Sequence, residues 1–221
     1  LLQRTGVLGH PAEWFNFRQV GHNCLSMRAY PVSAADYIEK IKHSQQGDNG
    51  VFSAEIGADH LQCLQEAVTM ETHFQRARHV LLYRTDILGQ AVSLFLATRS
   101  GYFNESQAEN RKHLPAYSGA GILQCLAGIL EQERQLVQYC NRRQIEPLMV
   151  SYEQLRENPG SVVGRIARHC GETVPAAVLA HIETGQRSKI ASSVNADYAR
   201  RFRGANGRRI ERLLKERAIP V

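Results

Sequence analysis

The segment 79–99 places an arginine and a serine where together they could bind a phosphate group. Residues 79–83 form a continuous apolar run, which is typical of a strand buried on both faces of a parallel sheet, and a helical pattern begins at Ile87. Arg84 therefore stands where a strand ends and a helix begins, a place where open α/β sheets bind ligands and where the helix N-terminus favours anions. Ser93 follows nine positions later, two turns into the helix. On chemistry alone, a phosphate clamp and a surface arginine with an ordinary helix serine are equally compatible with these residues.

A second candidate is the carboxylate of Glu13, which stands in the glycine- and proline-containing segment 6–15 beside Trp14 and Phe15. The turn-forming residues of this segment predict a loop or a bent helix start. A carboxylate displayed there can act as a general base if it reaches the proton of an attacking hydroxyl, an effect worth about 10²–10⁴ in rate. On residue types alone, a solvated carboxylate beside a packed aromatic pair is the simpler interpretation.

Three motifs, in the right order along the chain, resemble one enzyme family. Segment 6–15 reads G-V-x-G-x-P-x-E-[FWY]-F, segment 84–93 reads R-x-D-x-x-x-Q-A-V-S, and segment 145–163 reads I-E-P-L-x-V-x-Y-E-x-L-x-x-N-P-x-x-V-V. The sequence is similar to sulfotransferases that use 3′-phosphoadenosine 5′-phosphosulfate (PAPS), and more narrowly it resembles the bacterial trehalose 2-sulfotransferase-like family. The resemblance extends from residue 1 to about residue 203.

The resemblance implies which residues bind the donor co-substrate, PAPS. Arg84 and Ser93 correspond to the residues that bind its 3′-phosphate. The stretch 198–203 (Y-A-R-R-F-R) is similar to the family's W-x-x-R-[YF]-R, which makes Arg201 and Arg203 further candidates for contact with PAPS. An exposed basic helix whose side-chain stems cover apolar surface explains that stretch equally well. Nothing in these patterns calls for a metal ion.

The resemblance also implies an acceptor side. In the family, the segment that corresponds to 6–15 lines the acceptor pocket, and its glutamate is proposed as the general base. Carried over, Glu13 is the base, and His10, Trp14 and Phe15 are candidate acceptor contacts. The implied reaction moves a sulfuryl group from PAPS to a hydroxyl of a carbohydrate or glycolipid. The implied partners are that acceptor and a second copy of the chain in a homodimer, without nucleic acid.

Segment 50–59 departs from the family pattern G-V-[FW]-G-x-K-[IL]-M-W-[ND]. Glu55 replaces the family's lysine, and Gly57 and Ala58 replace its methionine and tryptophan. A positive charge becomes negative and two bulky side chains are lost. If this segment helps to line the acceptor pocket, we expect a roomier and differently charged pocket, and an acceptor other than trehalose.

The family's 5′-phosphosulfate loop, an Arg-Ser-Gly-Ser-Thr-like segment whose backbone N–H groups cradle the anion, is not found in the sequence. The alignment places it just before Leu1, so we expect the loop and the first strand upstream. The fold implied is α/β, a P-loop-like three-layer fold with a mainly parallel sheet flanked by helices. Strands are predicted at 51–56, 79–83 and 147–152, and residues 1–221 are expected to form a single sulfotransferase domain.

Capping residues and hydrophobic spacing predict the helices. Ser33 is predicted to cap a helix over 34–43, Thr85 or Asp86 the helix that starts at Ile87, and Ser161 a helix over 162–170. Further helices are predicted at 59–74, 117–141, 153–157, 176–183, 197–203 and 208–217.

No functional role is predicted for two segments without a regular pattern, or for the polar side of one helix. Residues 16–31 are expected to be irregular, and the polar segment 101–116 is a candidate lid. Glu131, Glu133 and Arg134 are assigned to the solvated side of their helix.

The hydrophobic pattern and the cysteines bear on where in the cell the protein is expected. No apolar run approaches the ~18 residues that a membrane span needs, so no transmembrane segment is predicted, and no targeting segment is visible. The five cysteines are widely spread without a C-x-x-C pair. They are interpreted as reduced thiols in a cytoplasmic protein.

The net charge of +6 is concentrated near the C-terminus. After Gln186 there are ten Lys/Arg and three Asp/Glu residues, whereas the first 186 residues hold 17 basic and 18 acidic ones. A non-catalytic anion- or nucleic-acid-binding module that uses this basic tail is therefore one alternative, although no base-reading motif supports it. A P-loop small-molecule kinase is another, but neither a Walker lysine nor Mg²⁺-binding carboxylates are identifiable.

Overall fold

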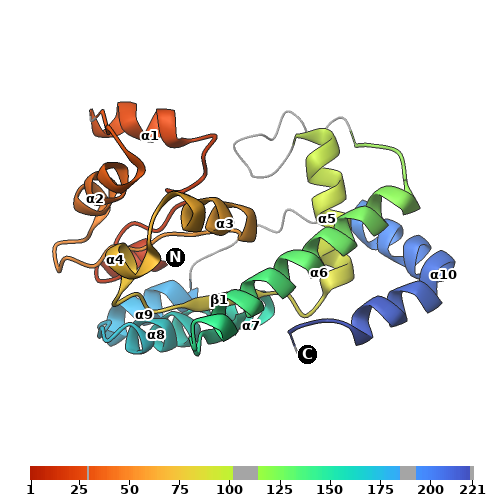
Figure 1. Ribbon diagram of the computed structural model, residues 1–221. Coiled ribbons are helices and arrows are strands. Elements are labelled where there is room, and N and C mark those ends of the chain that lie inside the picture. Colours follow the sequence, from red (N-terminus) through yellow and green to blue (C-terminus); the bar gives the residue numbers. More distant parts are fainter. Residues whose placement is uncertain (29, 102–113, 185–192, 220–221) are drawn as a thin grey trace. The chain divides into compact units, whose positions relative to one another are not determined.

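Two short strands and a larger number of helices make up the described chain, which is therefore mixed α/β. The computed structural model describes residues 1–28, 30–101, 114–184 and 193–219. The chain forms two compact units. Figure 1 shows its helices and strands, coloured along the sequence. Unit 1 is Leu1–Leu82 with Gln144–Gly185, and unit 2 is Tyr83–Arg143 with Gln186–Val221.

Unit 1 contains most of the elements. They are η1 (Leu2–Thr5), α1 (Val20–Met27), α2 (Ala34–Gln45), α3 (Ala58–Ala67), α4 (Met70–Phe74), β1 (Val80–Tyr83, whose last residue belongs to unit 2), β2 (Leu148–Ser151), α7 (Tyr152–Glu157), α8 (Pro159–His169) and α9 (Ala176–Thr184). Unit 2 contains α5 (Ile87–Ser100), α6 (Gly119–Arg142) and α10 (Ser193–Lys215).

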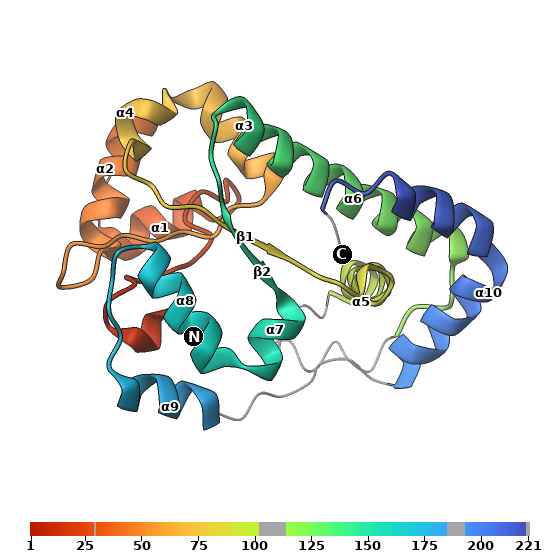
Figure 2. The same ribbon diagram turned by 90° about the horizontal axis from the view of Figure 1, so that it is seen from below.

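Strands β1 and β2 lie side by side and run parallel, although they are far apart in sequence (Figure 2). Leu148 N donates to the carbonyl of His79 at 2.9 Å, at the start of the ladder. Helix α8 contributes Val162 and Ile166 to a core cluster that also contains Val150 of β2, which is fully buried. At the end of β2, Ser151 and Gln154 form a reciprocal capping box, so the chain turns directly from strand into α7.

The three helices of unit 2 share one apolar core. It consists of Ile87, Leu88, Ala91, Val92, Phe95 and Leu96 from α5, Ile122, Leu126 and Ile129 from α6, and Phe202 and Ile210 from α10. Asp86 caps α5 by accepting from Gly89 N at 2.9 Å. Asn206 has non-helical dihedral angles, so α10 is in effect two helices joined at a kink.

Many of the predicted elements are confirmed. The strands predicted at 79–83 and 147–152 correspond to β1 and β2, and the capped helices that begin after Ser33 and Asp86 are α2 and α5. The kink in α10 separates the two basic helices predicted at 197–203 and 208–217. The three-layer arrangement stays a prediction.

Segment 51–56 is not a strand, which corrects one prediction. Its backbone makes isolated bonds to neighbouring loops instead of a ladder. Val51 O accepts from Gly47 N at 2.9 Å, and Glu55 N donates to Ala12 O at 2.8 Å. The segment therefore serves as a support for residues 6–15.

Three further predictions were wrong in detail. The region 16–31, expected to be irregular, contains α1. The single helix predicted over 59–74 is two helices, because Val68 is extended. Ser161 lies inside α8, which begins with Pro159 after Asn158 as its N-cap. The lid predicted at 101–116 falls largely on 102–113, outside the described residues.

Glu133 also differs from its prediction, because it is buried and not solvated. Its side chain is only 10% exposed and forms a salt bridge with Arg217, whose side chain is 4% exposed. A carboxylate on the polar side of a helix can be buried when a distant cation covers it, and helical periodicity cannot reveal that cation.

Substitution of Gly9 by alanine should destabilise the protein more than substitution of Gly6. Both glycines have left-handed backbones, with φ of +63° and +72°, which costs a non-glycine residue about 1–2 kcal/mol. A Cβ at Gly9 would also lie 2.5 Å from Val51 O, whereas one at Gly6 meets nothing within 4 Å. We expect Gly9→Ala to cost about 1–3 kcal/mol more than Gly6→Ala in urea unfolding, as overpacking does. Equal losses of unfolding free energy would show that segment 51–56 shifts at no cost to make room for the new Cβ.

Candidate functional site

In unit 1, the segment 6–15 is held through its backbone. Thr5 Oγ1 accepts from the amides of Val7 and Leu8, each at 3.2 Å, where the chain leaves η1. Ser53 Oγ donates to the carbonyl of Leu8 at 2.6 Å, and Glu55 N donates to that of Ala12. Because these hydrogen bonds fix the backbone of the loop, they also fix the directions in which its side chains leave it.

The carbonyl of Trp14 accepts two side-chain hydrogen bonds. It accepts from the hydroxyl of Tyr37 at 2.6 Å and from Asn23 Nδ2 at 3.4 Å, and Asn23 also donates to the Tyr37 hydroxyl at 3.0 Å. Both supporting side chains are buried, and burial raises the pKa of the Tyr37 phenol, which keeps the donating proton in place. Sequence reasoning missed Asn23, because it lies in the region expected to be irregular.

Glu13 is exposed, and Asn16 Nδ2 donates to its Oε2 at 2.8 Å. His10 is also exposed, and Gln3 Nε2 donates to its Nδ1 at 3.0 Å. The indole of Trp14 is half-buried and donates through Nε1 to the carbonyl of His10 at 2.8 Å. A carboxylate, an imidazole and an indole thus lie on one short loop, each oriented by a neighbour. Such a set can accept a proton and contact a polar ligand.

Phe15 lies in the core, with 4% of its surface exposed. Its ring packs edge-to-face on Phe74 at a centroid distance of 5.7 Å and on Phe52 at 6.3 Å. Its role in this fold is to anchor the loop, and direct contact with an acceptor stays a prediction.

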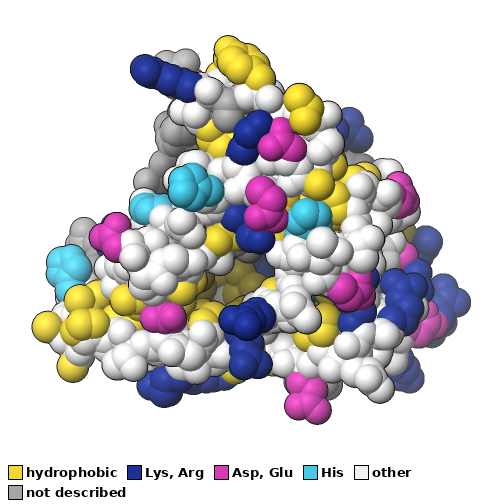
Figure 3. Space-filling model, turned by 60° about the vertical axis from the view of Figure 1, so that its left-hand side comes forward, with side chains coloured by type: hydrophobic (Ala, Val, Ile, Leu, Met, Phe, Trp, Pro, Cys, Tyr) yellow, Lys and Arg dark blue, Asp and Glu magenta, His cyan; other side chains and the backbone are white. Residues whose placement is uncertain are grey.

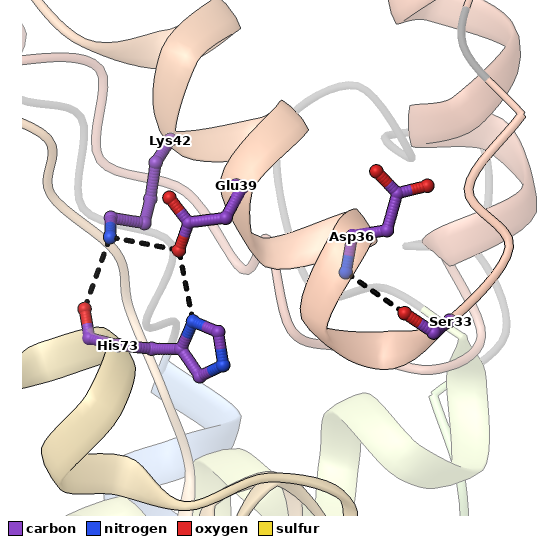
Figure 4. Close-up of polar contacts among 5 residues, drawn as sticks. All are labelled: Ser33, Asp36, Glu39, Lys42 and His73. Carbon is purple, nitrogen blue, oxygen red and sulfur yellow. Dashed lines mark hydrogen bonds and ion pairs between the residues drawn. The ribbon is translucent and has the colours of Figure 1, made fainter.

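A polar network joins α2 to α4, as Figure 4 shows. Its Lys42 Nζ lies 5.8 Å from the ring centroid of Phe74. His73 Nδ1 donates to Glu39 Oε1 at 2.9 Å. Lys42 Nζ donates to the same carboxylate oxygen at 3.3 Å and to the carbonyl of His73 at 3.1 Å. The hydrogen bond from His73 is the main cause that lowers the pKa of Glu39. The network therefore supports the aromatic cluster in which Phe15 is anchored.

In unit 2, Arg84 stands directly after β1 and before the capped start of α5. Its carbonyl accepts from Arg217 Nη2 at 2.6 Å. Arg217 also donates from Nε and Nη2 to the two carboxylate oxygens of Glu133, at 2.8 Å and 2.6 Å. Sequence reasoning missed Arg217, since no local pattern distinguishes it from the other basic residues of the tail.

Ser93 is half-buried on α5, and its hydroxyl accepts from Asn195 Nδ2 at 3.0 Å. One turn before it, Gln90 Oε1 is a buried acceptor without a hydrogen-bond partner in the described part of the chain. Arg84, Gln90 and Ser93 all belong to the R-x-D-x-x-x-Q-A-V-S motif. The donor types present, a guanidinium, a hydroxyl and amide groups, are those that bind phosphate esters.

The two basic candidates on α10 differ in their surroundings. Arg201 stacks on Tyr117 at 4.0 Å from the ring centroid, lies 5.9 Å from that of Tyr198, and approaches Asp197 at 3.8 Å. Arg203 is exposed. The tyrosine pair is itself fixed, because the Tyr198 hydroxyl donates to the carbonyl of Pro115 at 2.8 Å. Both side chains are therefore exposed, but Arg201 is held by aromatic contacts.

Surface charge, metal ligands and the length of the helices add three observations. Figure 3 shows one face of the molecule, on which acidic, basic and histidine side chains lie interspersed. Within residues 1–28, 30–101, 114–184 and 193–219, no three His, Cys, Asp or Glu side chains converge as a metal site. In those same ranges no helix has the length and apolar character that crossing a membrane requires.

Comparison with known families defines the class of this chain as sulfotransferase. The chain belongs to the Stf0 sulphotransferase family, whose model matches residues 1–205. This confirms the resemblance found in the three motifs. No curated protein matches the chain.

The Glu39 network makes a pH-dependent contribution to stability that can be measured. Glu39→Gln should lower the free energy of unfolding by about 0.2–1 kcal/mol at neutral pH, the range for exposed ion pairs. Because the folded protein holds the pKa of Glu39 below its ordinary value of 4.5, this contribution is complete above that value and is lost as the pH falls through the lowered pKa. Urea unfolding of both proteins should therefore show a difference that shrinks at acid pH. A difference that grows on acidification would contradict the assigned network.

Proposed function

We propose that this chain transfers the sulfuryl group of PAPS to a hydroxyl of a carbohydrate or glycolipid. The observation that carries the proposal is the R-x-D-x-x-x-Q-A-V-S motif in its structural context. Arg84 follows a parallel strand, Asp86 caps the helix that comes next, and Ser93 is oriented on that helix by Asn195. Membership of a sulfotransferase family supports sulfuryl transfer as the reaction class.

Arg84 and Ser93 are proposed to bind the 3′-phosphate of the donor. The guanidinium supplies charge-assisted hydrogen bonds, which are worth roughly 1.5–3 kcal/mol, and the hydroxyl adds a neutral one. Arg201 and Arg203 on α10 are proposed to contribute further positive charge near the donor.

Glu13 is proposed as the general base. The acceptor hydroxyl oxygen forms the new bond to sulfur while the bond between sulfur and the 5′-phosphate oxygen breaks, and Glu13 takes the hydroxyl proton. The electron pair of the broken bond leaves with 3′-phosphoadenosine 5′-phosphate. As in phosphoryl transfer, the protein mainly positions the groups and neutralises charge. The exposure of Glu13 and its bond from Asn16 fit this role.

The acceptor is proposed to lie against His10 and Trp14, with Phe15 behind them. An indole offers an apolar face with a polar edge, which suits the C–H face and hydroxyls of a sugar. The exposed Glu55 adjoins this loop through its backbone bond to Ala12, and it adds a second carboxylate where the family pattern has lysine. This supports an acceptor other than trehalose, one that tolerates or uses a negative pocket.

We further propose that residues 1–221 belong to one sulfotransferase domain that works in the cytoplasm. The free thiols support a reducing compartment, since none of the five cysteines is in a disulfide. Burial raises the pKa of the Cys125, Cys140 and Cys170 thiols, which keeps them protonated and unreactive.

Calorimetric titration of the full-length protein with 3′-phosphoadenosine 5′-phosphate, with 5′-AMP as the comparison, tests the donor site. The bisphosphate should bind tightly and AMP weakly, because only the former has the 3′-phosphate. Arg84→Ala should weaken bisphosphate binding by about 1.5–3 kcal/mol, the worth of a charged hydrogen bond.

Arg99→Ala is the matched control, since this exposed arginine lies at the other end of α5. It should leave the affinity unchanged. If the wild type binds neither nucleotide, the PAPS proposal fails. If it binds the bisphosphate but Arg84→Ala binds it equally well, the phosphate is held elsewhere.

Glu13→Gln should leave bisphosphate affinity intact and reduce turnover by about 10²–10⁴, because the amide cannot accept the hydroxyl proton. Turnover is measured as nucleotide release from PAPS in the presence of a panel of mono- and disaccharides and glycolipids. Glu66→Gln, an exposed glutamate on α3, serves as the control and should be silent. Turnover of Glu13→Gln at the wild-type rate would remove Glu13 from the chemistry.

A further inference from the structure

We infer that the C-terminal segment braces the donor site, and that Arg217 is a positioning residue for Arg84. The inference rests on the proposed function, since it concerns the residues assigned to the 3′-phosphate. We call the two contacts that Arg217 and Asn195 make with Arg84 and Ser93 the C-terminal brace. Arg217 lies beyond the part of the chain that the family model matches, residues 1–205.

The first contact of the brace is built on a buried ion pair. Arg217 and Glu133 share two hydrogen bonds, at 2.6 Å and 2.8 Å, and their side chains are 4% and 10% exposed. The pair neutralises both charges in a place that water hardly reaches. The planar guanidinium is therefore held at a fixed angle by its carboxylate partner.

The same guanidinium reaches the backbone of Arg84. Its Nη2 donates to the Arg84 carbonyl at 2.6 Å, which fixes the orientation of the peptide between Arg84 and Thr85. The Arg84 side chain projects from this backbone, just before the capped start of α5. A lysine at position 217 could pair with Glu133, but its single ammonium lacks the rigid fork that serves both partners at once.

The second contact of the brace orients the other candidate ligand. Asn195 Nδ2 donates to Ser93 Oγ at 3.0 Å, near the opposite end of the C-terminal segment. Between the two contacts, α10 is seated on the core of unit 2 by Phe202 and Ile210, one on each side of the kink at Asn206. The residues proposed to bind one phosphate are thus both held by a single, well-anchored segment.

A purely structural role for the ion pair makes a different prediction. Buried ion pairs can often be replaced by apolar residues of similar size without loss of stability. If Arg217 and Glu133 served folding alone, a double substitution to methionine would leave nucleotide recognition unchanged. If Arg217 positions Arg84, the same substitution frees the Arg84 carbonyl and impairs recognition of the 3′-phosphate specifically.

The test compares E133M/R217M and R217K with the wild type by titration of the full chain with 3′-phosphoadenosine 5′-phosphate and 5′-AMP. Both variants should bind the bisphosphate about tenfold more weakly. This is the lower end of the loss seen at metal sites when a residue that orients a ligand is removed. Their affinity for AMP should not change, so the discrimination between the nucleotides falls. R217K keeps the buried charges paired and provides the test should the double variant fold poorly.

The control is E131M/R134M, which removes the exposed Glu131–Arg134 pair from the same helix. It should leave both affinities unchanged. If R217K and folded E133M/R217M both discriminate between the two nucleotides as well as the wild type does, the C-terminal brace is wrong and the proposed donor function stands. A wild type that binds neither nucleotide, or both equally, overturns the proposed donor function and the brace with it.

Discussion

One buried contact joins three segments of unit 2: the guanidinium of Arg217 lies between the carboxylate of Glu133 and the carbonyl of Arg84. Removal of water from both charges is costly, so the pair is stable only when it is complete and fully hydrogen-bonded. Completing it brings together α6, the chain after α10 and the turn after β1. The apolar core shared by α5, α6 and α10 supplies the attraction between these helices, which is non-directional. The ion pair adds direction, because a bidentate contact tolerates little displacement along the helix.

In unit 1, hydrogen bonds to a loop, and not a buried ion pair, fix the candidate residues. The loop 6–15 has no regular hydrogen-bonding pattern of its own, and it is held by donors that approach its carbonyls from elsewhere in the unit. Ser53, the backbone of Glu55, and Tyr37 with Asn23 bind the carbonyls of Leu8, Ala12 and Trp14 respectively. Fixing the backbone leaves Glu13 and His10 exposed. An exposed carboxylate on a rigid loop can meet a substrate with little loss of conformational entropy on binding.

Local signals explain which elements could be predicted. The strand before Arg84, the Asp86 cap and the helix that carries Ser93 all follow from residues within a few positions of one another, and these were predicted correctly. Helix α1 was missed because its only buried side chain is the polar Asn23, so that it has no apolar stripe. Segment 51–56 has the composition of a strand, but it lies against a loop whose spaced carbonyls permit single bonds and no ladder. Periodicity reports which side of an element is buried, and it does not report what covers it.

The sequence by itself determined the family, the order of the motifs and the chemical types of the candidate residues, because each of these resides in short runs of chain. It also determined the cap and strand that place Arg84 at a helix start. The tertiary structure alone decided that Glu133 is buried, that Asn195 and Arg217 reach Ser93 and Arg84, and that Phe15 is an anchor in the core. These contacts join residues that are 37 to 133 positions apart in the sequence, from Phe15–Phe52 to Arg84–Arg217. At such separations the pairing is set by packing geometry and not by local propensity.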